Sequence, residues 1–221
     1  MSTSAPRPNA GPLSPVTESN NGSSEAPDNP LDAIGWPVHT TRLALRPATG
    51  DDLEATWGFR RLEEVSLWIT RAPATLEEYT TGFEDAARLA KTLIIELDGQ
   101  VIGDLMLQVE DGWAQAEVAD QARGVHAELG WVLHPDHAGY GYATEAVGEL
   151  IRLCFEDLGL RRVTANCFAD NIASWRLMER IGMRRELYTV RDSLHRSGEW
   201  LDGVGYALLA EEWTAAAPTR G

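Results

Sequence analysis

The sequence predicts one mixed α/β domain with a central, mostly antiparallel sheet of about seven strands that is flanked by helices. Its 221 residues, of which 43% are apolar, are enough for one well-buried domain and few for two. The apolar runs 92–97 and 101–109 flank the pair Asp98-Gly99, which tolerates positive φ and suits a tight antiparallel hairpin. Between residues 144 and 158, apolar side chains recur at helical spacing and a glycine follows.

Before that hairpin, the pattern alternates from strand to helix. Residues 38–47 alternate between apolar and polar side chains and close on a proline, which predicts a first strand. Capping residues at 49–52 then predict a helix that runs to residue 61. A second helix is predicted over 75–91, because Thr75 and Glu78 have the spacing of a capping box.

After the hairpin, residues 110–124 are polar and carry the exposed Trp113, which predicts a long loop that could cover a substrate or a partner chain. Strand character resumes at 125–133, ahead of the helix at 144–158. The rest of the pattern predicts strands and one further helix, 171–181. These last strands are 162–168, 183–190 and 200–209.

Residues 1–35 differ from the remainder in composition. They are rich in Ser, Pro, Asn, Gly and Ala and lack apolar periodicity, so we expect a disordered N-terminal tail followed by one domain over 36–215. The first 30 residues lack the basic start and apolar run of a signal peptide, and no stretch approaches the roughly 20 apolar residues of a membrane span. We therefore expect a cytoplasmic protein without a membrane partner.

Cysteine count and charge limit the possible functions. Cys154 and Cys167 are too few for a disulfide scaffold and too sparse for a metal site, so both are expected to be buried thiols and no metal is expected. The net charge is −15, and −12 remains without the tail, whose residues contribute −3. An acidic domain argues against a nucleic-acid partner and mildly favours an amine-bearing substrate, although solubility alone explains the charge equally well.

The segment from His134 to Glu145, HPDHAGYGYATE, has the properties of an anion-binding loop. Gly139, Gly141 and Ala143 let the backbone approach a ligand closely, and the first turn of the following helix offers unpaired N–H groups at the positive end of its dipole. A glycine-containing turn without a ligand is the alternative interpretation.

Two other nucleotide-binding patterns do not fit this segment. A phosphate loop of the Walker type needs Gly-Lys-Ser/Thr, and the segment has no lysine. A Rossmann fingerprint needs a third small residue where Thr144 stands, at the first strand of a parallel βαβ unit, whereas antiparallel strands precede this loop.

The same residues resemble the signature of the GNAT acetyltransferase superfamily, Gln/Arg-x-x-Gly-x-Gly/Ala after the fourth strand. The matching run is Ala138-Gly139-Tyr140-Gly141-Tyr142-Ala143. Ala138 departs from the usual Gln or Arg, but in that family the loop binds the coenzyme pyrophosphate largely through backbone amides. The wider string Gly-Tyr-Ala-Thr-Glu-Ala is similar to the branch that contains the ribosomal-protein alanine acetyltransferases RimJ and RimL.

Two downstream segments extend the resemblance over residues 38–213. Residues 170–183 resemble that branch's Asn-x-x-Ser helix with its closing Gly-Met/Phe, and residues 198–202 resemble the entry to its C-terminal strand. The resemblance implies a sheet that splits between its fourth and fifth strands and admits acetyl-CoA as co-substrate, with no metal. We also expect a homodimer.

The resemblance implies roles for individual residues. A backbone N–H at a bulge near Val132 and Leu133 polarises the thioester, Ser174 protonates the leaving thiolate, and Asn171 binds the pantetheine arm. Helix capping is the alternative role for Asn171, and an ordinary first-turn position is the alternative for Ser174. The expected coenzyme-binding residues are Val132, Leu133, Ala138, Gly139, Tyr140, Gly141, Tyr142, Ala143, Thr144, Asn171 and Ser174.

Glu128 is the first choice for the base that deprotonates the amine, because it lies on the strand beside the thioester end of the expected groove. An exposed strand position is the alternative interpretation. His134 and His137 follow the strand on the phosphate side, so coenzyme-facing or structural roles suit them better, and Glu117 in the long loop is a further candidate. For the acceptor groove, we single out Trp68 and Tyr79 among the aromatic residues.

The sequence therefore predicts an N-acetyltransferase that transfers acetyl directly from acetyl-CoA to a primary amine. Its acceptor is either a protein N-terminus or a small-molecule amine, and the resemblance does not separate the two. The competing hypothesis is a non-catalytic acyl-CoA-binding sensor or scaffold of the same fold, which the departure at Ala138 would permit.

Overall fold

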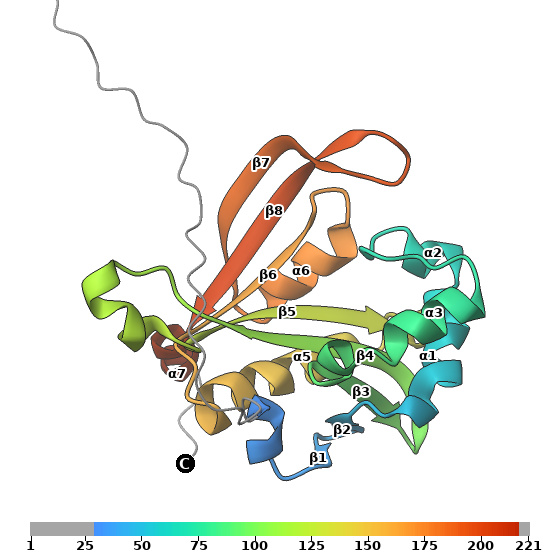
Figure 1. Ribbon diagram of the computed structural model, residues 1–221, viewed down its shortest axis with the longest axis horizontal. Coiled ribbons are helices and arrows are strands. Elements are labelled where there is room, and N and C mark those ends of the chain that lie inside the picture. Colours follow the sequence, from blue (N-terminus) through green and yellow to red (C-terminus); the bar gives the residue numbers. More distant parts are fainter. Residues whose placement is uncertain (1–28, 217–221) are drawn as a thin grey trace, which may run out of the picture.

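The computed structural model describes residues 29–216 and contains one eight-stranded open sheet (Figure 1). The strand order is β1-β2-β3-β4-β5-β6-β8-β7, and every neighbouring pair is antiparallel except β5 and β6. The strands are β1 Val38–His39, β2 Leu43–Pro47, β3 Thr92–Leu97, β4 Gln100–Glu110, β5 His126–Leu133, β6 Arg162–Phe168, β7 Arg184–Leu194 and β8 Trp200–Leu209. The predicted mixed α/β fold with a mostly antiparallel sheet is confirmed.

The sheet has eight strands rather than seven because the predicted first strand is interrupted. Thr40 forms a turn there: its hydroxyl oxygen accepts from the backbone N–H groups of Arg42 and Leu43 at 3.4 and 3.0 Å. The two halves, β1 and β2, then pair with each other. At the other predicted hairpin, Asp98 and Gly99 have φ values of 51° and 79°, as the tight turn between β3 and β4 requires.

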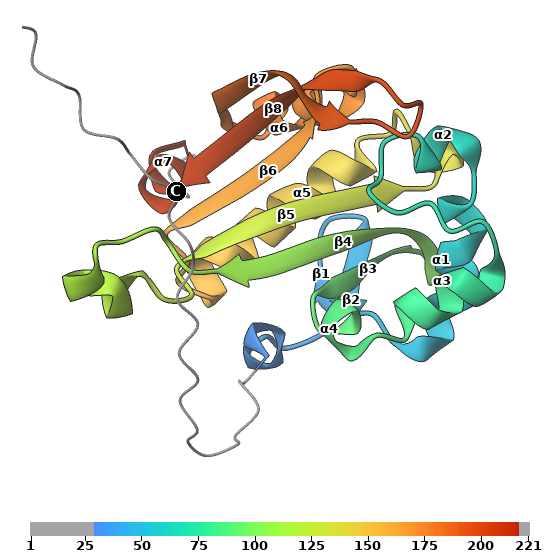
Figure 2. The same cartoon turned by 45° about the horizontal axis from the view of Figure 1, so that its top comes forward.

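Helices cover both faces of the sheet (Figure 2). They are α1 Leu53–Arg60, α2 Glu63–Ser66, α3 Leu76–Phe83, α4 Ala86–Leu89, α5 Tyr142–Arg152, α6 Ile172–Arg180 and α7 Ala210–Ala216. One core cluster joins the sheet to α5 and α6, with Val147 and Leu150 completely buried. A second, smaller cluster joins the opposite face to α3 through Tyr79, Phe83 and Ile94. The two faces therefore carry different helices.

Several helix boundaries differ from the predictions. The predicted helix 75–91 is divided into α3 and α4 because Asp85 adopts an extended conformation and caps the next helix through the N–H of Arg88. Helix α5 begins at Tyr142, two residues earlier than predicted, and ends at Arg152; the last part of the predicted helix, Leu153–Asp157, is a π-helical turn that follows α5. The short helices α2 and α7 were not predicted from the sequence.

The predicted boundary of the N-terminal tail is too late. Residues 30–33 form a 3-10 helix capped by Asn29, and Leu31 and Ile34 are buried in the main core at 3% and 8% exposure. Burial of these two apolar side chains ties the segment to the domain. The rest of the predicted tail, residues 1–28, lies outside the described residues. Between residues 29 and 216, no helix is long and apolar enough to cross a membrane.

Candidate active site

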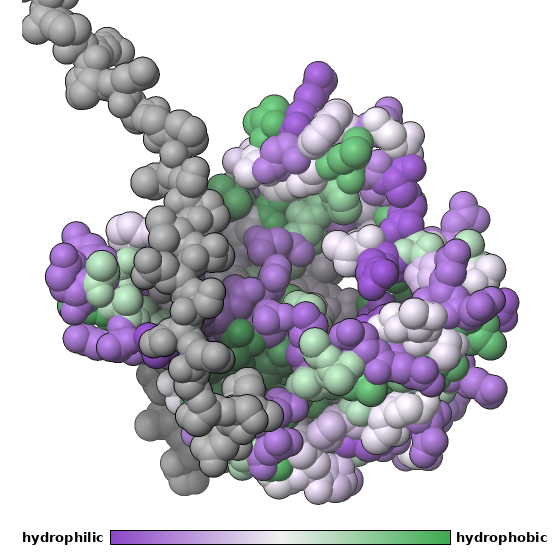
Figure 3. Space-filling view, viewed as in Figure 1, coloured by the Kyte–Doolittle hydropathy of each residue, from purple (hydrophilic) through white to green (hydrophobic). Residues whose placement is uncertain are grey.

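The sheet splits between its two parallel strands. β5 pairs with β6 at only three positions, His126, Ala127 and Glu128, and beyond Glu128 it continues beside β4 alone. The split is continuous with a groove of about 1500 Å³, which is lined by residues from both faces of the sheet. Figure 3 shows the surface hollowed between the β7–β8 hairpin and the helices α1–α3. Glu128 therefore stands where the strands separate.

The backbone of β5 beyond Glu128 offers hydrogen-bonding groups to the split. His134 donates its N–H to Ile102 of β4. Because backbone groups alternate in direction along a strand, those of Trp131 and Leu133 point away from β4 and toward the split. The predicted bulge is absent, since the β4–β5 register is continuous to Leu133. The carbonyl of Val132 faces β4 beside Gly103, so the geometry favours Leu133 over Val132 for contact with a thioester.

The glycine loop connects β5 to α5, as predicted from the sequence. Gly139 and Gly141 have φ values of 84° and 83°, in the left-handed region that side chains disfavour. Gly141 is the N-cap of α5, and the first helical turn, whose N–H groups have no partner within the helix, lines the groove. All predicted coenzyme-binding residues line the same groove: Val132, Leu133, Ala138, Gly139, Tyr140, Gly141, Tyr142, Ala143, Thr144, Asn171 and Ser174.

The turn between β1 and β2 holds this loop from outside. Arg42 donates to Glu145 in the first turn of α5 through its Nε at 2.7 Å, and to the carbonyl of Tyr140 at 3.0 Å. Its guanidinium also lies 4.5 Å from the centre of the Tyr142 ring. Thr40 completes the contact with a 2.6 Å hydrogen bond to Glu145. We call Thr40, Arg42 and Glu145 the loop clasp.

The loop clasp keeps Glu145 ionised. Partial burial raises the pKa of Glu145, but hydrogen bonds from Thr40 and Arg42 outweigh it and hold the pKa below its ordinary value. The cation of Arg42 adds to this effect. A carboxylate in the first turn of α5 also suits the positive end of the helix dipole.

Helix α6 forms the opposite wall of the groove. The side chain of Asn171 accepts from the N–H of Ser174 at 3.3 Å and caps the helix, so the capping role considered for Asn171 is present. Ser174 faces the thiol of Cys167 on β6. Burial raises the pKa of Cys167 to about 11, and the hydrogen bond from Ser174 offsets part of that rise. Arg180 joins the two helices through the hydroxyl of Thr144 at 3.0 Å.

Glu128 lies on the face of the sheet opposite α5. Its neighbours Ala127 and Leu129 are in the core with α5, and successive side chains on a strand point to opposite faces. Its carboxylate accepts from the side-chain amide of Asn166 at 3.1 Å, across the start of the split. The residues of the glycine loop and Glu128 thus approach the split from opposite faces of the sheet.

The same face carries a buried ion pair that lines the groove. Asp104 on β4, with 3% exposure, accepts from the guanidinium of Arg60 on α1 at 2.7 and 2.5 Å. Burial lowers the pKa of Arg60, but Asp104 outweighs it and the pKa is raised. The pair fixes α1 against the sheet beside the split.

The groove, its two helix N-termini and the glycine loop agree with the family comparison. The protein-family model of the acetyltransferase (GNAT) domain matches residues 42–184, which are more than half of the chain. The chain belongs to the GNAT family. It is an acetyl-CoA-dependent acyltransferase, as the N-acetyltransferases among its relatives indicate.

Relatives extend the match over the domain. The uncharacterized N-acetyltransferase YnaD of Bacillus subtilis is 41% identical over 179 residues, which are 80% of this chain and 98% of YnaD. The ribosomal protein uS5 alanine N-acetyltransferase of Escherichia coli is 33% identical over 86 residues, or 39% of this chain and 44% of that enzyme.

Solved structures give the same result for the fold. A GNAT acetyltransferase from Bacillus anthracis is 29% identical with a TM-score of 0.67, covering 79% of this chain and 99% of its own. RimJ of Mycobacterium smegmatis, solved with CoA-disulfide, has a TM-score of 0.62 at 24% identity and covers 77% of this chain and 83% of its own. The predicted membership of the GNAT family is confirmed, and the resemblance to the RimJ/RimL-like branch extends to the 86 residues shared with the uS5 alanine N-acetyltransferase.

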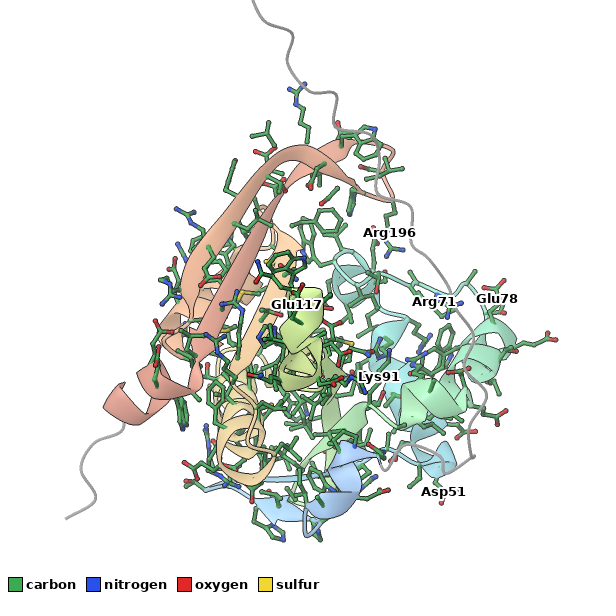
Figure 4. The ribbon with its side chains drawn as sticks, turned by 60° about the vertical axis from the view of Figure 1, so that its left-hand side comes forward. Asp51, Arg71, Glu78, Lys91, Glu117 and Arg196 are labelled. Carbon is green, nitrogen blue, oxygen red and sulfur yellow. The ribbon has the colours of Figure 1, made fainter. Side chains whose placement is uncertain are left out.

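Within this GNAT domain, some of the residues singled out from the sequence lie outside the groove. Tyr79 is wrong as an acceptor residue: it is 1% exposed, packs against Trp57 and donates to Thr56. Glu117 is exposed on the 3-10 segment between β4 and β5 and does not line the groove; in Figure 4 this segment comes toward the viewer. Trp113, in the same connection, is 92% exposed.

Trp68 and His137 do line the groove, whereas His134 instead accepts a hydrogen bond from the N–H of Asp136 and caps a short 3-10 turn. The sequence did not reveal the loop clasp or the ion pair of Arg60 and Asp104, whose partners are 44 to 105 residues apart. A signal was present only for Glu145, because an acid in the first turn of a helix is a typical partner for a nearby cation.

Proposed function

We propose that this GNAT domain transfers acetyl from acetyl-CoA directly to a primary amine, either a protein N-terminus or a small-molecule amine. Acetyl-CoA lies with its pyrophosphate at residues 138–144 and its pantetheine arm between the separated strands, near Asn171. The acceptor approaches from the opposite face, where Glu128 lies. No metal takes part in this scheme.

The transfer proceeds as one displacement at the thioester carbonyl. The amine nitrogen attacks the carbonyl carbon, a C–N bond forms, and the C–S bond then breaks. Glu128 takes the proton that the amine loses, through a water molecule. The backbone N–H of Leu133 stabilises the negative charge that develops on the carbonyl oxygen. Ser174 gives its proton to the leaving thiolate and regains one from solvent.

The placement of Glu128 is the observation that carries this proposal. The residue marks the last β5–β6 pair, so its carboxylate lies where both faces of the sheet meet the split. Asn166 orients one carboxylate oxygen and leaves the other open to a donor. A base at this point can reach an amine that enters from one face and a thioester that enters from the other.

The test measures thiol release from acetyl-CoA with a panel of primary amines. We expect Glu128→Gln to lower kcat by about a hundredfold or more, in the range for loss of a general base, and Ser174→Ala to lower it less. Neither variant should change the acetyl-CoA dissociation constant by more than about twofold. Glu117→Gln is the matched control, because this carboxylate lies outside the groove. Equal kcat values for Glu128→Gln and the control would exclude the assigned base.

The same assay tests the competing hypothesis of a non-catalytic acyl-CoA sensor, against which the N-acetyltransferases among the relatives argue. That hypothesis rests on Ala138, which stands where related loops usually have Gln or Arg. The sensor would bind acetyl-CoA tightly and release no thiol with any amine, and neither substitution would alter its behaviour. Turnover with any acceptor of the panel excludes it.

A further inference from the structure

The acceptor side of the groove is enclosed by segments that are far apart in the sequence. Trp68 lies between α2 and α3, and Phe168 ends β6; both line the groove, and their ring centres are 6.0 Å apart. Phe168 shares its face of β6 with Asn166, the partner of Glu128, because side chains two positions apart point the same way. The two rings therefore lie on the side from which an acceptor approaches Glu128.

His195, in the turn between β7 and β8, joins these rings. It is 8% exposed, and its ring centre lies 5.6 Å from that of Trp68 and 5.3 Å from that of Phe168. The backbone N–H of Ser197 donates to its Nδ1 at 3.2 Å, so Nδ1 carries no proton. Nε2 then carries the proton and donates it to the carbonyl of Leu67 at 2.9 Å.

Arg196 makes a second contact between the same segments. Its guanidinium donates to the carbonyl of Ile69. In Figure 4 Arg196 is labelled at the tip of the β7–β8 hairpin, near the segment that follows α2. Two adjacent residues of the turn thus hold two carbonyl groups of the segment 67–70. We call these contacts the acceptor latch.

The acceptor latch closes a ring of chain segments around the approach to Glu128. From β5 the ring passes to β4 by strand pairing, and to α1 through Arg60 and Asp104. The chain continues through α2 to Leu67, and His195 carries the ring to the β7–β8 hairpin. β8 pairs with β6, and β6 returns to β5 at the start of the split. Every one of these segments contributes to the ring by covalent connection, strand pairing or a side-chain bond.

We propose that this ring selects the acceptor by shape: the substrate is a primary amine at the end of a slender chain, which enters end-on. A bulky group next to the amine carbon meets Trp68, Phe168 and the turn at His195 before the amine reaches Glu128. This inference rests on the proposed function, because it concerns the acceptor of the same site. A linear alkyl amine and a flexible peptide N-terminus both have this shape.

The experiment compares two amines with the same reactive CH2–NH2 group. Hexylamine is slender and 1-adamantanemethylamine is bulky, and the ratio of their kcat/KM values measures the selection by shape. We expect the full-length protein to favour hexylamine by at least tenfold. His195→Ala should lower this ratio at least fivefold, by raising kcat/KM for the bulky amine. His195→Gln, which keeps a donor for Leu67, should restore most of the ratio.

Further arms separate the alternatives. Arg196→Ala should lower the ratio less than His195→Ala, while Arg191→Ala is the matched control on the same hairpin, since none of its described contacts reaches the segment 67–70. The acetyl-CoA dissociation constant should stay unchanged in all four variants, because the coenzyme loop lies on the other side of the sheet. The tripeptide Ala-Gly-Gly, assayed beside hexylamine, shows whether a peptide N-terminus or an alkyl amine is the preferred acceptor.

The outcomes distinguish this inference from the proposed function. If the wild-type protein acetylates both amines with equal kcat/KM, or if His195→Ala and Arg196→Ala keep the wild-type ratio while folded, the ring does not select the acceptor and the proposal is wrong. If no amine is acetylated at all, the proposed function itself fails. If the His195→Ala variant does not fold, the Arg196→Ala and His195→Gln variants still allow the ratio of kcat/KM for the two amines to be compared with that of the wild type.

Discussion

The two sides of the split sheet are built in different ways. The proposed coenzyme side comes from continuous segments, the loop 134–141 with α5 and the start of α6. The acceptor side is assembled from α1, the segment 67–70, β6 and the β7–β8 turn, which side-chain contacts hold together. A change on the first side should therefore alter coenzyme affinity, whereas a change on the second should alter stability and choice of acceptor.

The largest expected effect lies on the acceptor side, at the buried ion pair. Asp104→Ala should lower the free energy of unfolding by about 3–5 kcal/mol, because it leaves the guanidinium of Arg60 buried without its partner. Denaturant unfolding followed by fluorescence measures this change. The exposed partners of Arg152 on α5 give the control: Glu156→Ala should cost about 1 kcal/mol or less.

A double variant separates the charge from the packing. Replacing both partners by apolar residues of similar size, Arg60→Met with Asp104→Leu, should recover most of the lost stability. If Asp104→Ala costs no more than Glu156→Ala, the pair does not hold α1 to the sheet, and the contrast between the two sides of the split loses its main support.

The next effect concerns the coenzyme side. Gly141→Val should raise the acetyl-CoA dissociation constant at least tenfold, about 1.4 kcal/mol. A branched side chain disfavours the φ of 83° at this position, and it would project from the N-cap toward Arg42 and into the proposed pyrophosphate site. Calorimetric titration measures the affinity, and Gly148→Val in the middle of the same helix is the control. Wild-type affinity in a folded Gly141→Val protein would exclude this loop as the pyrophosphate site.

The fold was predictable where short-range patterns determine it. The turn at Asp98-Gly99 and the apolar stripe of α5 depend on residues adjacent in the sequence, and both were predicted. The interruption of the first strand was not, because it depends on the hydroxyl of Thr40, whose strongest partner, Glu145, is 105 positions away. The division of the predicted helix 75–91 at Asp85 shows a local cap prevailing over apolar periodicity.

The same distinction applies to the site. The glycine loop and Ser174 could be placed beside the groove because a motif in the sequence keeps them close to the helix N-termini. Tyr79 was misplaced, since helical periodicity shows that a side chain is buried but not which layer of the protein buries it. Asp104 and His195 gave no signal, because the partners that they reach across the fold, Arg60 and the carbonyl of Leu67, come near only in the tertiary structure.

The smallest expected effect tests whether the coenzyme side is as self-contained as its sequence suggests. Arg42 belongs to the β1–β2 turn, yet it holds the carbonyl of Tyr140 and the carboxylate of Glu145. Arg42→Ala should raise the acetyl-CoA dissociation constant about threefold to fivefold and leave kcat unchanged, because the loop loses its support but keeps its backbone donors. Arg42→Lys should recover part of the affinity. Arg152→Ala, which breaks ion pairs at the far end of α5, should not change affinity.

The pH dependence of stability shows whether Glu145 acts through its charge. Its pKa is lowered in the folded protein, so the loop clasp contributes its full stability above the ordinary value of about 4.5 and loses it as the pH falls through the lower folded value. The difference in unfolding free energy between wild type and Glu145→Gln should therefore be constant from pH 8 to 5 and shrink below pH 4.5. Because Arg42 is 42% exposed, solvent screening limits this difference to about 1 kcal/mol. A difference that instead changes between pH 8 and 6 would assign the effect to another group, and the coenzyme loop would then be held by its own backbone alone.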